Sequence, residues 1–260
     1  MLCCKQGNIY KKYTKIQIIS KTNNSKIYIV KDNNNKQFIL KKISCMNKSL
    51  INNEIKCLKC LQNNIHVNNF INYEYNYFKF YLILEYIHGK TLAQYLDNNP
   101  TENDIITIIN KLVIIFKEIQ KRNIIHRDIK LENIMIANNS LKVIDFGYSI
   151  IVKNIDTFMT NEPCGTLPYM CPEMIQYQFY SSSCDSWSLG VLFYVLLTKQ
   201  FPYSITKSEM QMYQMFKTGF KDKIQTINLN NIVNEKMKQL IKQLLHYDRD
   251  ERIKINKIII

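Results

Sequence analysis

The chain has 260 residues, enough for one large domain or for two small lobes that share a cleft. Hydrophobic residues make up 46% of it and aromatic residues 12%, which can fill a sizeable core and excludes a globally disordered chain. The formal net charge is +14, but the lysines are scattered along the chain, so charge alone does not select a function. No apolar run approaches the roughly 18 residues that a membrane-spanning helix needs, and we expect a soluble protein.

Eight cysteines without a secretory signal or regular spacing predict a reducing compartment, and we expect a cytoplasmic protein with nuclear access left open. Cys57 and Cys60 have metal-like spacing, but both fit a helical pattern and we interpret them as packing residues. Cys3 and Cys4 form a candidate thioacylation site that would give weak membrane association. N-myristoylation is not expected, because the second residue is Leu2 and not glycine.

Short runs rich in β-branched residues alternate with polar turns in the first third of the chain, a pattern typical of strands. We expect strands at residues 16–19, 26–30, 37–43, 70–77 and 80–85. Between the third and fourth strands, apolar residues recur at helical spacing over residues 49–61. This third of the chain is therefore predicted to be a sheet with one helix.

Helical patterns dominate after Gly89, and Thr101 with Asp104 has the spacing of a capping box at a helix start. We expect helices at residues 101–122, 184–197, 207–218 and 234–245. The predicted fold class is α+β, with a small β-rich lobe that holds one helix and a larger helical lobe. The predicted divisions are an N-terminal extension at 1–14, an N-lobe at 15–84, a hinge at 85–89 and a C-lobe at 90–260.

Three motifs follow one another in the second half of the chain. Residues 126–133 are His-Arg-Asp-Ile-Lys-Leu-Glu-Asn, residues 145–147 are Asp-Phe-Gly, and residues 170–173 are Met-Cys-Pro-Glu. Phosphoryl transfer needs a proton acceptor, ligands for Mg²⁺, a cation on the phosphates and in-line positioning. In this order and spacing, the motifs resemble those of the eukaryotic protein kinase family, from about Lys15 to Arg252.

The resemblance implies a bilobal kinase fold and a task for each matching position. Asp128 resembles the catalytic base, and Lys130 resembles the lysine that Ser/Thr kinases place near the γ-phosphate. Asn133 and Asp145 resemble the Mg²⁺ ligands, since both offer hard oxygen atoms. The similarity extends loosely to the CAMK-like, polo-like and autophagy-initiating groups, without a choice among them.

Lys41 resembles the strand lysine that neutralises the α- and β-phosphates of ATP, and Glu54 resembles its ion-pair partner. The resemblance implies two further structural contacts. Asp185 is expected to support the catalytic loop, and Arg252 is expected to form an ion pair with Glu173. A packing role against Phe146 is expected for His126. By resemblance, the ATP pocket is lined by Ile19, Ser20, Thr22, Ser25, Ile27, Ile39, Lys41, Leu84, Glu85, Ile87 and Met135.

The loop above ATP departs from the family pattern. Its three glycine positions are Ser20, Thr22 and Ser25, which lack the backbone freedom of glycine, so we expect weaker ATP affinity or a stiffer, more open loop. Ile39 replaces the usual alanine and is expected to narrow the nucleotide slot. The 13 residues from Lys41 to Glu54 form a short separation, so the helix is expected to begin late or to sit unusually.

The segment between residues 147 and 170 carries a regulatory hint. Arg127 belongs to a position that in the family binds an anion from this segment, and many relatives supply it with a phosphothreonine where this chain has Glu162. We hypothesise that Glu162 partly mimics that phosphate; the alternative is a solvated loop glutamate. Thr160 is a candidate phosphorylation site, and Thr166 fits the Ser/Thr type.

The sequence thus predicts a Mg²⁺- and ATP-dependent kinase that phosphorylates serine or threonine in protein substrates. The alternative is a pseudokinase, a scaffold with weak or no phosphotransfer, which the altered loop and Ile39 favour. A nucleic-acid partner is not expected, because no recognised binding motif is present. The substrate and the oligomeric state stay open.

Overall fold

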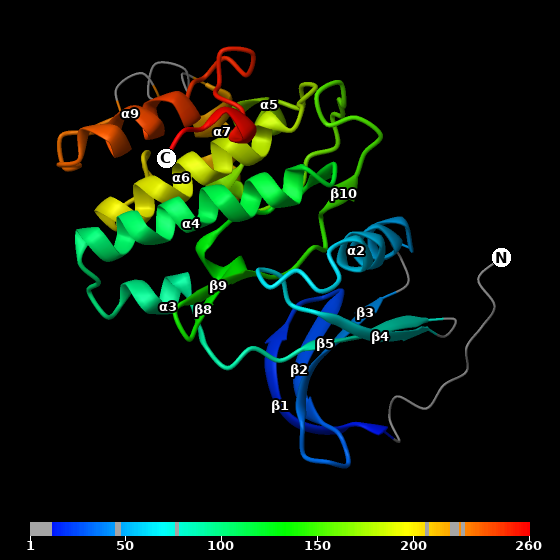
Figure 1. The fold of residues 1–260 in the computed structure, drawn as a ribbon. Coiled ribbons are helices and arrows are strands. Elements are labelled where there is room, and N and C mark those ends of the chain that lie inside the picture. Colours follow the sequence, from blue (N-terminus) through cyan, green and yellow to red (C-terminus); the bar gives the residue numbers. More distant parts are fainter. Residues whose placement is uncertain (1–11, 45–47, 76–77, 206–207, 219–223, 225–226) are drawn as a thin grey trace.

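The computed structural model describes residues 12–44, 48–75, 78–205, 208–218, 224 and 227–260. They form a sheet-rich N-lobe and a mostly helical C-lobe, joined through residues 85–89 (Figure 1). This arrangement confirms the predicted bilobal α+β fold class. The predicted division points stay predictions, and most of the predicted N-terminal extension, residues 1–11, lies outside the described residues.

The N-lobe is built on an antiparallel sheet with the strand order β1-β2-β3-β5-β4. Its strands are β1 (Thr14–Lys21), β2 (Ser25–Lys31), β3 (Gln37–Ser44), β4 (Phe70–Tyr75) and β5 (Lys79–Glu85). Lys41 lies opposite Ile27 of β2 and Leu82 of β5, so these three side chains share one face of the sheet. We call it the inner face, because α2 (Lys48–Cys60) packs with this side in the main core.

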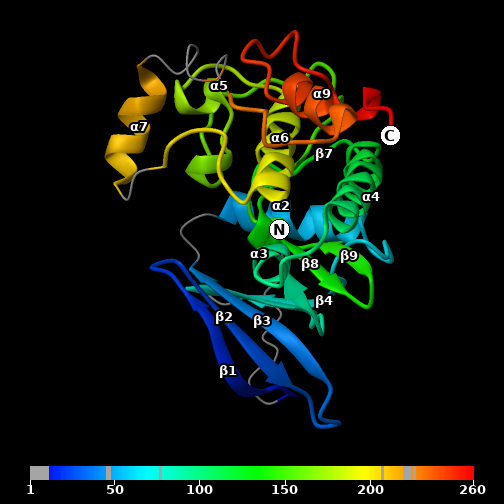
Figure 2. The same ribbon diagram turned by 90° about the vertical axis from the view of Figure 1, so that its left-hand side faces the viewer.

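The other side of the sheet, the outer face, has a small core of its own. Its buried members are Tyr13, Val30, Phe38, Leu40, Tyr81 and Ile83, and Tyr28 packs against them. In Figures 1 and 2 the sheet forms the end of the molecule away from the helices of the C-lobe. The lobe therefore has one face toward the rest of the protein and one face of aromatic side chains on the opposite side.

The C-lobe is organised around α6 (Ser183–Thr198), whose residues are buried on every side up to Leu196. The long helix α4 (Glu102–Gln120) and the helix α9 (Glu235–Leu244) pack beside it, and Figure 2 shows α7 (Glu209–Lys217) standing at the edge of the lobe. A helix that is hydrophobic all round belongs at a domain centre. Among the described helices, none is both long and apolar enough to cross a bilayer.

The C-lobe also contains several short elements. These are β6 (Lys90–Thr91), α3 (Leu92–Leu96), β7 (Ile124–Ile125), β8 (Ile134–Ala137), β9 (Ser140–Val143), β10 (Ile150–Ile151), α5 (Pro172–Ile175) and single 3₁₀ turns at Leu131–Asn133, Leu167–Tyr169 and Ile255–Lys257. The sequence did not predict them, since pieces of two to five residues leave no hydrophobic period to detect.

The longer elements lie where their patterns predicted, within two residues at most ends that the structure describes. The capping box at Thr101 is confirmed: its hydroxyl accepts from the Asp104 backbone N–H (3.2 Å), and the Asp104 carboxylate accepts from the Thr101 backbone N–H (3.0 Å). The β1 strand is longer than predicted. The last two residues of the strand predicted at 70–77 lie outside the described residues.

Gly190 sets how closely α6 and α9 approach. A methyl group at this position would lie 2.8 Å from Leu244 Cβ and 2.8 Å from Leu245 Cδ2, inside van der Waals contact. We therefore expect Gly190→Ala to destabilise the protein by about 1–3 kcal/mol through overpacking, measured as a lower midpoint in a thermal melt. Helix propensity alone favours alanine over glycine by about 1 kcal/mol, so a raised midpoint would contradict this packing argument.

Candidate active site

Asp185, which is fully buried in α6, anchors the catalytic loop that begins at His126. Its two carboxylate oxygens accept the backbone N–H groups of His126 and Arg127, each at 2.8 Å. This anchor stabilises Arg127 in a left-handed conformation with φ of 65°, which costs free energy for a non-glycine residue. The predicted support of the loop by Asp185 is confirmed. The predicted packing of His126 is also confirmed, with its ring 5.0 Å from that of Phe146.

Asp128 is buried at the end of this loop, and both of its carboxylate oxygens are bound. Oδ1 accepts from the Thr166 hydroxyl (2.7 Å), while Oδ2 accepts from Asn133 Nδ2 (2.9 Å) and pairs with Lys130 Nζ (2.9 Å). Lys130 Nζ also donates to the Thr166 hydroxyl (2.7 Å), so the four side chains form a closed network. Such a network fixes the direction in which Asp128 can receive a proton.

Lys41 joins the two lobes through two ion pairs. Its ammonium lies 2.7 Å from Glu54 Oε1 on α2 and 2.7 Å from Asp145 Oδ1 in the C-lobe. Burial lowers the pKa of Lys41, but the two carboxylates outweigh it and raise that pKa above its ordinary value. The short separation of 13 residues does not prevent the predicted Lys41–Glu54 pair, because α2 begins at Lys48 and brings Glu54 to the sheet.

Asp145 and Asn133 form a donor set that fits Mg²⁺. The Asp145 side chain is 40% exposed, and although burial raises its pKa, Lys41 lowers it to about 2, so the carboxylate is ionised at neutral pH. Asn133 Nδ2 donates to the backbone oxygen and to Oδ2 of Asp128, which leaves the Oδ1 acceptor for another ligand. One carboxylate and one amide oxygen, completed by phosphate oxygens and water, is a set typical of Mg²⁺ sites.

Residues 13–259 match the protein kinase domain family. The chain belongs to the protein kinase family. It is 33% identical over 196 residues to serine/threonine-protein kinase 33 of Bos taurus, covering 70% of this chain and 39% of that protein. It is also 33% identical over 193 residues to an Aurora kinase of Eremothecium gossypii, covering 71% and 50%. A match of 28% identity over 247 residues, covering 92% of this chain and 53% of the relative, is to the serine/threonine-protein kinase cds1 of Schizosaccharomyces pombe.

The chain spans about two fifths to half the length of these three relatives. Kinases of this family use ATP with Mg²⁺, in agreement with the donor set formed by Asn133 and Asp145. The ion pair that the family resemblance predicted between Arg252 and Glu173 is also present: Arg252 Nη2 lies 2.8 Å from Glu173 Oε1, and both residues are buried.

The kinase lid, the β1–β2 turn, closes on itself. The Thr22 hydroxyl accepts from the Ser25 backbone N–H (3.0 Å), and the two hydroxyls lie 3.0 Å apart. Ser20 and its neighbours in β1 are exposed, and Ile19 is 52% exposed. The turn is therefore pinned by side chains where the family has flexible glycines. The predicted stiffness and openness of the loop and the predicted effect on ATP affinity stay predictions.

The other predicted ATP-pocket residues come from both lobes. Register places Ile27, Ile39 and Leu84 on the inner face beside Lys41. Met135 lies in β8, which pairs with β6 directly after the hinge. The Glu85 side chain stabilises the start of the hinge. Its carboxylate accepts hydrogen bonds from Lys142 Nζ (2.8 Å) and from the Asn69 backbone N–H. Ile87 is buried in the hinge.

Arg127 does not bind Glu162 in this conformation. Its Nε donates to the Tyr148 carbonyl oxygen (2.7 Å), and its Nη1 donates to the Tyr180 hydroxyl (3.2 Å). That hydroxyl donates in turn to the Glu162 backbone oxygen (2.6 Å). Glu162 is thus tied to Arg127 through its main chain and a tyrosine, and no ion pair of its carboxylate occurs among the described residues. The phosphate-mimic hypothesis stays untested but gains no support from this geometry.

Tyr180 is the functional residue that motif matching missed. It is 1% exposed, and its backbone forms an isolated bridge with the candidate phosphorylation site Thr160. Its hydroxyl also lies 3.7 Å from Cys164 Sγ. A signal was present in the sequence only as an aromatic residue a few positions before Asp185. A tyrosine there is also compatible with simple core packing, so the sequence did not assign it a role.

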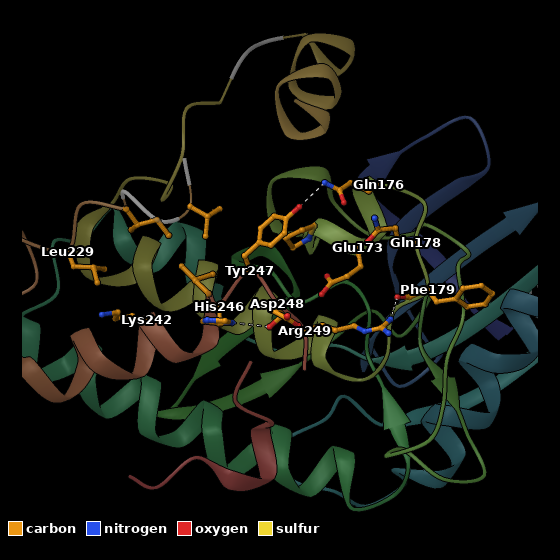
Figure 3. Close-up of a pocket in the computed structure, with 14 residues that line it drawn as sticks. Glu173, Gln176, Gln178, Phe179, Leu229, Lys242, His246, Tyr247, Asp248 and Arg249 are labelled. Atoms are coloured by element: carbon orange, nitrogen blue, oxygen red, sulfur yellow. Dashed lines mark hydrogen bonds between the residues drawn. The ribbon is translucent and has the colours of Figure 1, made fainter. Parts of the chain in front are cut away.

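A separate cavity of about 1050 Å³ opens in the C-lobe beside α5 and the end of α9 (Figure 3). Gln176 Nε2 donates to the Tyr247 hydroxyl (2.9 Å) at its wall, and Arg249 donates to the Phe179 carbonyl. Its charged lining groups have both signs, and neither Asp128 nor Lys41 lines it. This cavity is therefore distinct from the catalytic groups.

Thr166 is expected to act as a positioning residue for Asp128. Thr166→Ala removes the hydroxyl that bridges Asp128 and Lys130, and we expect kcat to fall about 10–100-fold with little change in KM for ATP. Thr166→Ser, which keeps the hydroxyl, is expected to restore most of the rate. Steady-state kinetics of both variants measure this, and a full rate in Thr166→Ala would contradict the role.

Tyr180 and Glu162 can be separated by mutation. Because Arg127 is bound by the Tyr180 hydroxyl and not by the Glu162 carboxylate, we expect Tyr180→Phe to lower the phosphorylation rate more than Glu162→Ala does. Loss of the hydroxyl leaves buried donors of Arg127 less satisfied, at a cost of about 1–3 kcal/mol. Rates are compared in phosphatase-treated samples with thermal melts alongside. A larger loss in Glu162→Ala would instead favour the phosphate-mimic hypothesis.

Proposed function

We propose that this protein transfers the γ-phosphate of ATP, in the presence of Mg²⁺, to serine or threonine hydroxyls of proteins. The observation that carries the proposal is the Asp128 carboxylate, held by Lys130, Thr166 and Asn133 at hydrogen-bonding distance. The four side chains form one hydrogen-bonded network that fixes the position of the carboxylate. In-line transfer to an incoming hydroxyl depends on such positioning. The curated relatives that are named serine/threonine kinases support the same activity.

The residues divide the chemistry between the lobes. Asp128 orients the substrate hydroxyl and accepts its proton as the oxygen–phosphorus bond forms. Lys130 neutralises charge near the transferring group, and Lys41 neutralises the non-transferring phosphates. Asn133 and Asp145 would hold Mg²⁺, which supplies neutralisation of charge on the phosphate oxygens. The ion pair with Glu54 holds Lys41 in position.

Lys130 and Thr166 support a Ser/Thr acceptor over tyrosine. Both side chains lie beside Asp128, at 2.9 Å and 2.7 Å, so the space at the carboxylate is occupied close to its oxygens. The preference for a serine or threonine hydroxyl rests on the resemblance of Lys130 and Thr166 to the residues that Ser/Thr kinases have at these positions. The protein substrate itself is not named by any residue of the site.

The pseudokinase alternative rests on the lid and on Ile39. Against it, the structure has the ion pair of Lys41 with Glu54 and the bound Asp128 in place together. A scaffold that only binds nucleotide could use the Lys41–Glu54 pair, but it has no need of a carboxylate held in place to accept a proton. We also propose a cytoplasmic location, with nuclear access left open; the free cysteines among the described residues support a reducing compartment.

The proposal is tested by incubating the purified full chain with radiolabelled ATP, Mg²⁺ and a generic basic protein. We expect label on phosphoserine or phosphothreonine after acid hydrolysis, none on phosphotyrosine, and loss of transfer when Mg²⁺ is chelated. Asp128→Asn is the matched control, since it keeps the size of the side chain. Incorporation no higher than in that variant would favour the pseudokinase.

A further inference from the structure

Basic residues are distributed unevenly between the two lobes. Residues 12–85 contain 12 lysines and 4 acidic residues, whereas residues 86–260 contain 21 basic and 17 acidic residues. Of the four acidic residues, Glu54 and Glu85 are engaged by Lys41 and Lys142, and Asp32 accepts backbone N–H groups of its own turn. The fourth, Glu74, lies opposite Tyr81 on the edge strand β4, so it is an acidic side chain on the outer face. The N-lobe therefore carries a large share of the positive charge of the protein.

The strand register gathers lysines on the outer face. Lys21 pairs with Lys26, and Lys15 pairs with the buried Val30, so these side chains point to the side that holds the aromatic core. Four ammonium groups lie over its rings: Lys12 over Tyr13 (5.6 Å), Lys15 over Tyr28 (4.5 Å), Lys36 over Phe38 (5.6 Å) and Lys42 over Tyr81 (5.6 Å). Cations and rings at these distances attract one another, which keeps the lysines spread over the sheet.

The aromatic rings of the outer face are unsuited to stacking on nucleic-acid bases. Tyr13, Phe38 and Tyr81 are only 6–7% exposed, and the half-buried Tyr28 ring lies under the Lys15 ammonium group, so none of these four rings is fully open to a base. Ile18 lies opposite Tyr28 on this face and is an exposed apolar side chain, 48% of it accessible to solvent. Lysines around an exposed aliphatic side chain suit the boundary between lipid headgroups and acyl chains.

We propose that the outer face docks on the surface of an anionic lipid bilayer. Charge complementarity supplies the attraction, since each basic residue held near such a surface raises the partition constant about fivefold. Docking through this face leaves the inner face, with Lys41, toward the C-lobe and away from the membrane (Figure 1). The catalytic groups would then stay open to protein substrates beside the bilayer. The proposal is independent of the kinase activity.

The position of this face in the chain agrees with the proposal. It begins at Lys12, shortly after Cys3 and Cys4, the predicted thioacylation site, which lies outside the described residues. One acyl chain with a basic surface is a combination that gives stable anchoring where either alone is weak. The docking does not require acylation and can be tested on unmodified protein.

The test is flotation of the full unacylated chain with vesicles of phosphatidylcholine alone or with about 30% phosphatidylserine. We expect binding to the anionic vesicles only, with loss at about 0.5 M salt. The variant Lys12→Glu/Lys15→Glu/Lys36→Glu is expected to bind at least tenfold more weakly than the parent. The reason is that the loss of each positive charge near the surface lowers the partition constant about fivefold.

A matched control has the same charge change on exposed C-lobe lysines, Lys111→Glu/Lys121→Glu/Lys257→Glu, and is expected to bind within about twofold of the parent. Thermal melts check folding, and the glutamine versions of the three outer-face changes replace the glutamate versions if these unfold. Equal binding to both vesicle types, no binding, or an equal loss in the control would overturn the proposal. Binding of single-stranded RNA or polyglutamate without vesicle binding would overturn it as well.

Discussion

The active geometry of this kinase depends on the position of one ammonium group. Lys41 holds Glu54 of α2 and Asp145 of the C-lobe at 2.7 Å each, so a strand, a helix and the metal-binding segment meet at a single charge. Gly147 makes room for this meeting, because a methyl group there would lie 3.2 Å from Lys41 Nζ and 3.1 Å from Asp145 Oδ1. The relative placement of the lobes and the ionisation of Asp145 both follow from this contact.

The C-lobe half of the site depends on burial. Asp185 can hold the strained loop because α6 is surrounded by core residues and its carboxylate has no access to water. Gly165, with φ of 97°, brings the segment that carries Thr166 against the loop: a methyl group there would lie 2.4 Å from the Arg127 oxygen. The orientation of Asp128 thus depends on two contacts. Asp185 of α6 binds the backbone of the loop, and the Thr166 hydroxyl donates to the Asp128 carboxylate.

Motif residues and long elements could be predicted from the sequence, because each carries a local signal. Lys41, Asp128, Asn133 and Asp145 belong to short patterns of fixed spacing, and the helices have a clear apolar period. Tyr180 and the hydroxyl bridge of Thr166 could not be predicted, since both depend on contacts between distant segments. The lysines of the N-lobe look scattered along the chain, and only the register of the sheet brings them to one face.

The most direct test of this account is a double-mutant cycle on Lys41 and Glu54, measured as single-turnover transfer from ATP. If Glu54 acts by holding Lys41, Lys41→Met and the double variant Lys41→Met/Glu54→Gln are predicted to have equal rates, each about a hundredfold or more below the parent. Glu54→Gln alone is predicted to lie between them and the parent. Independent losses that multiply in the double variant would contradict the account.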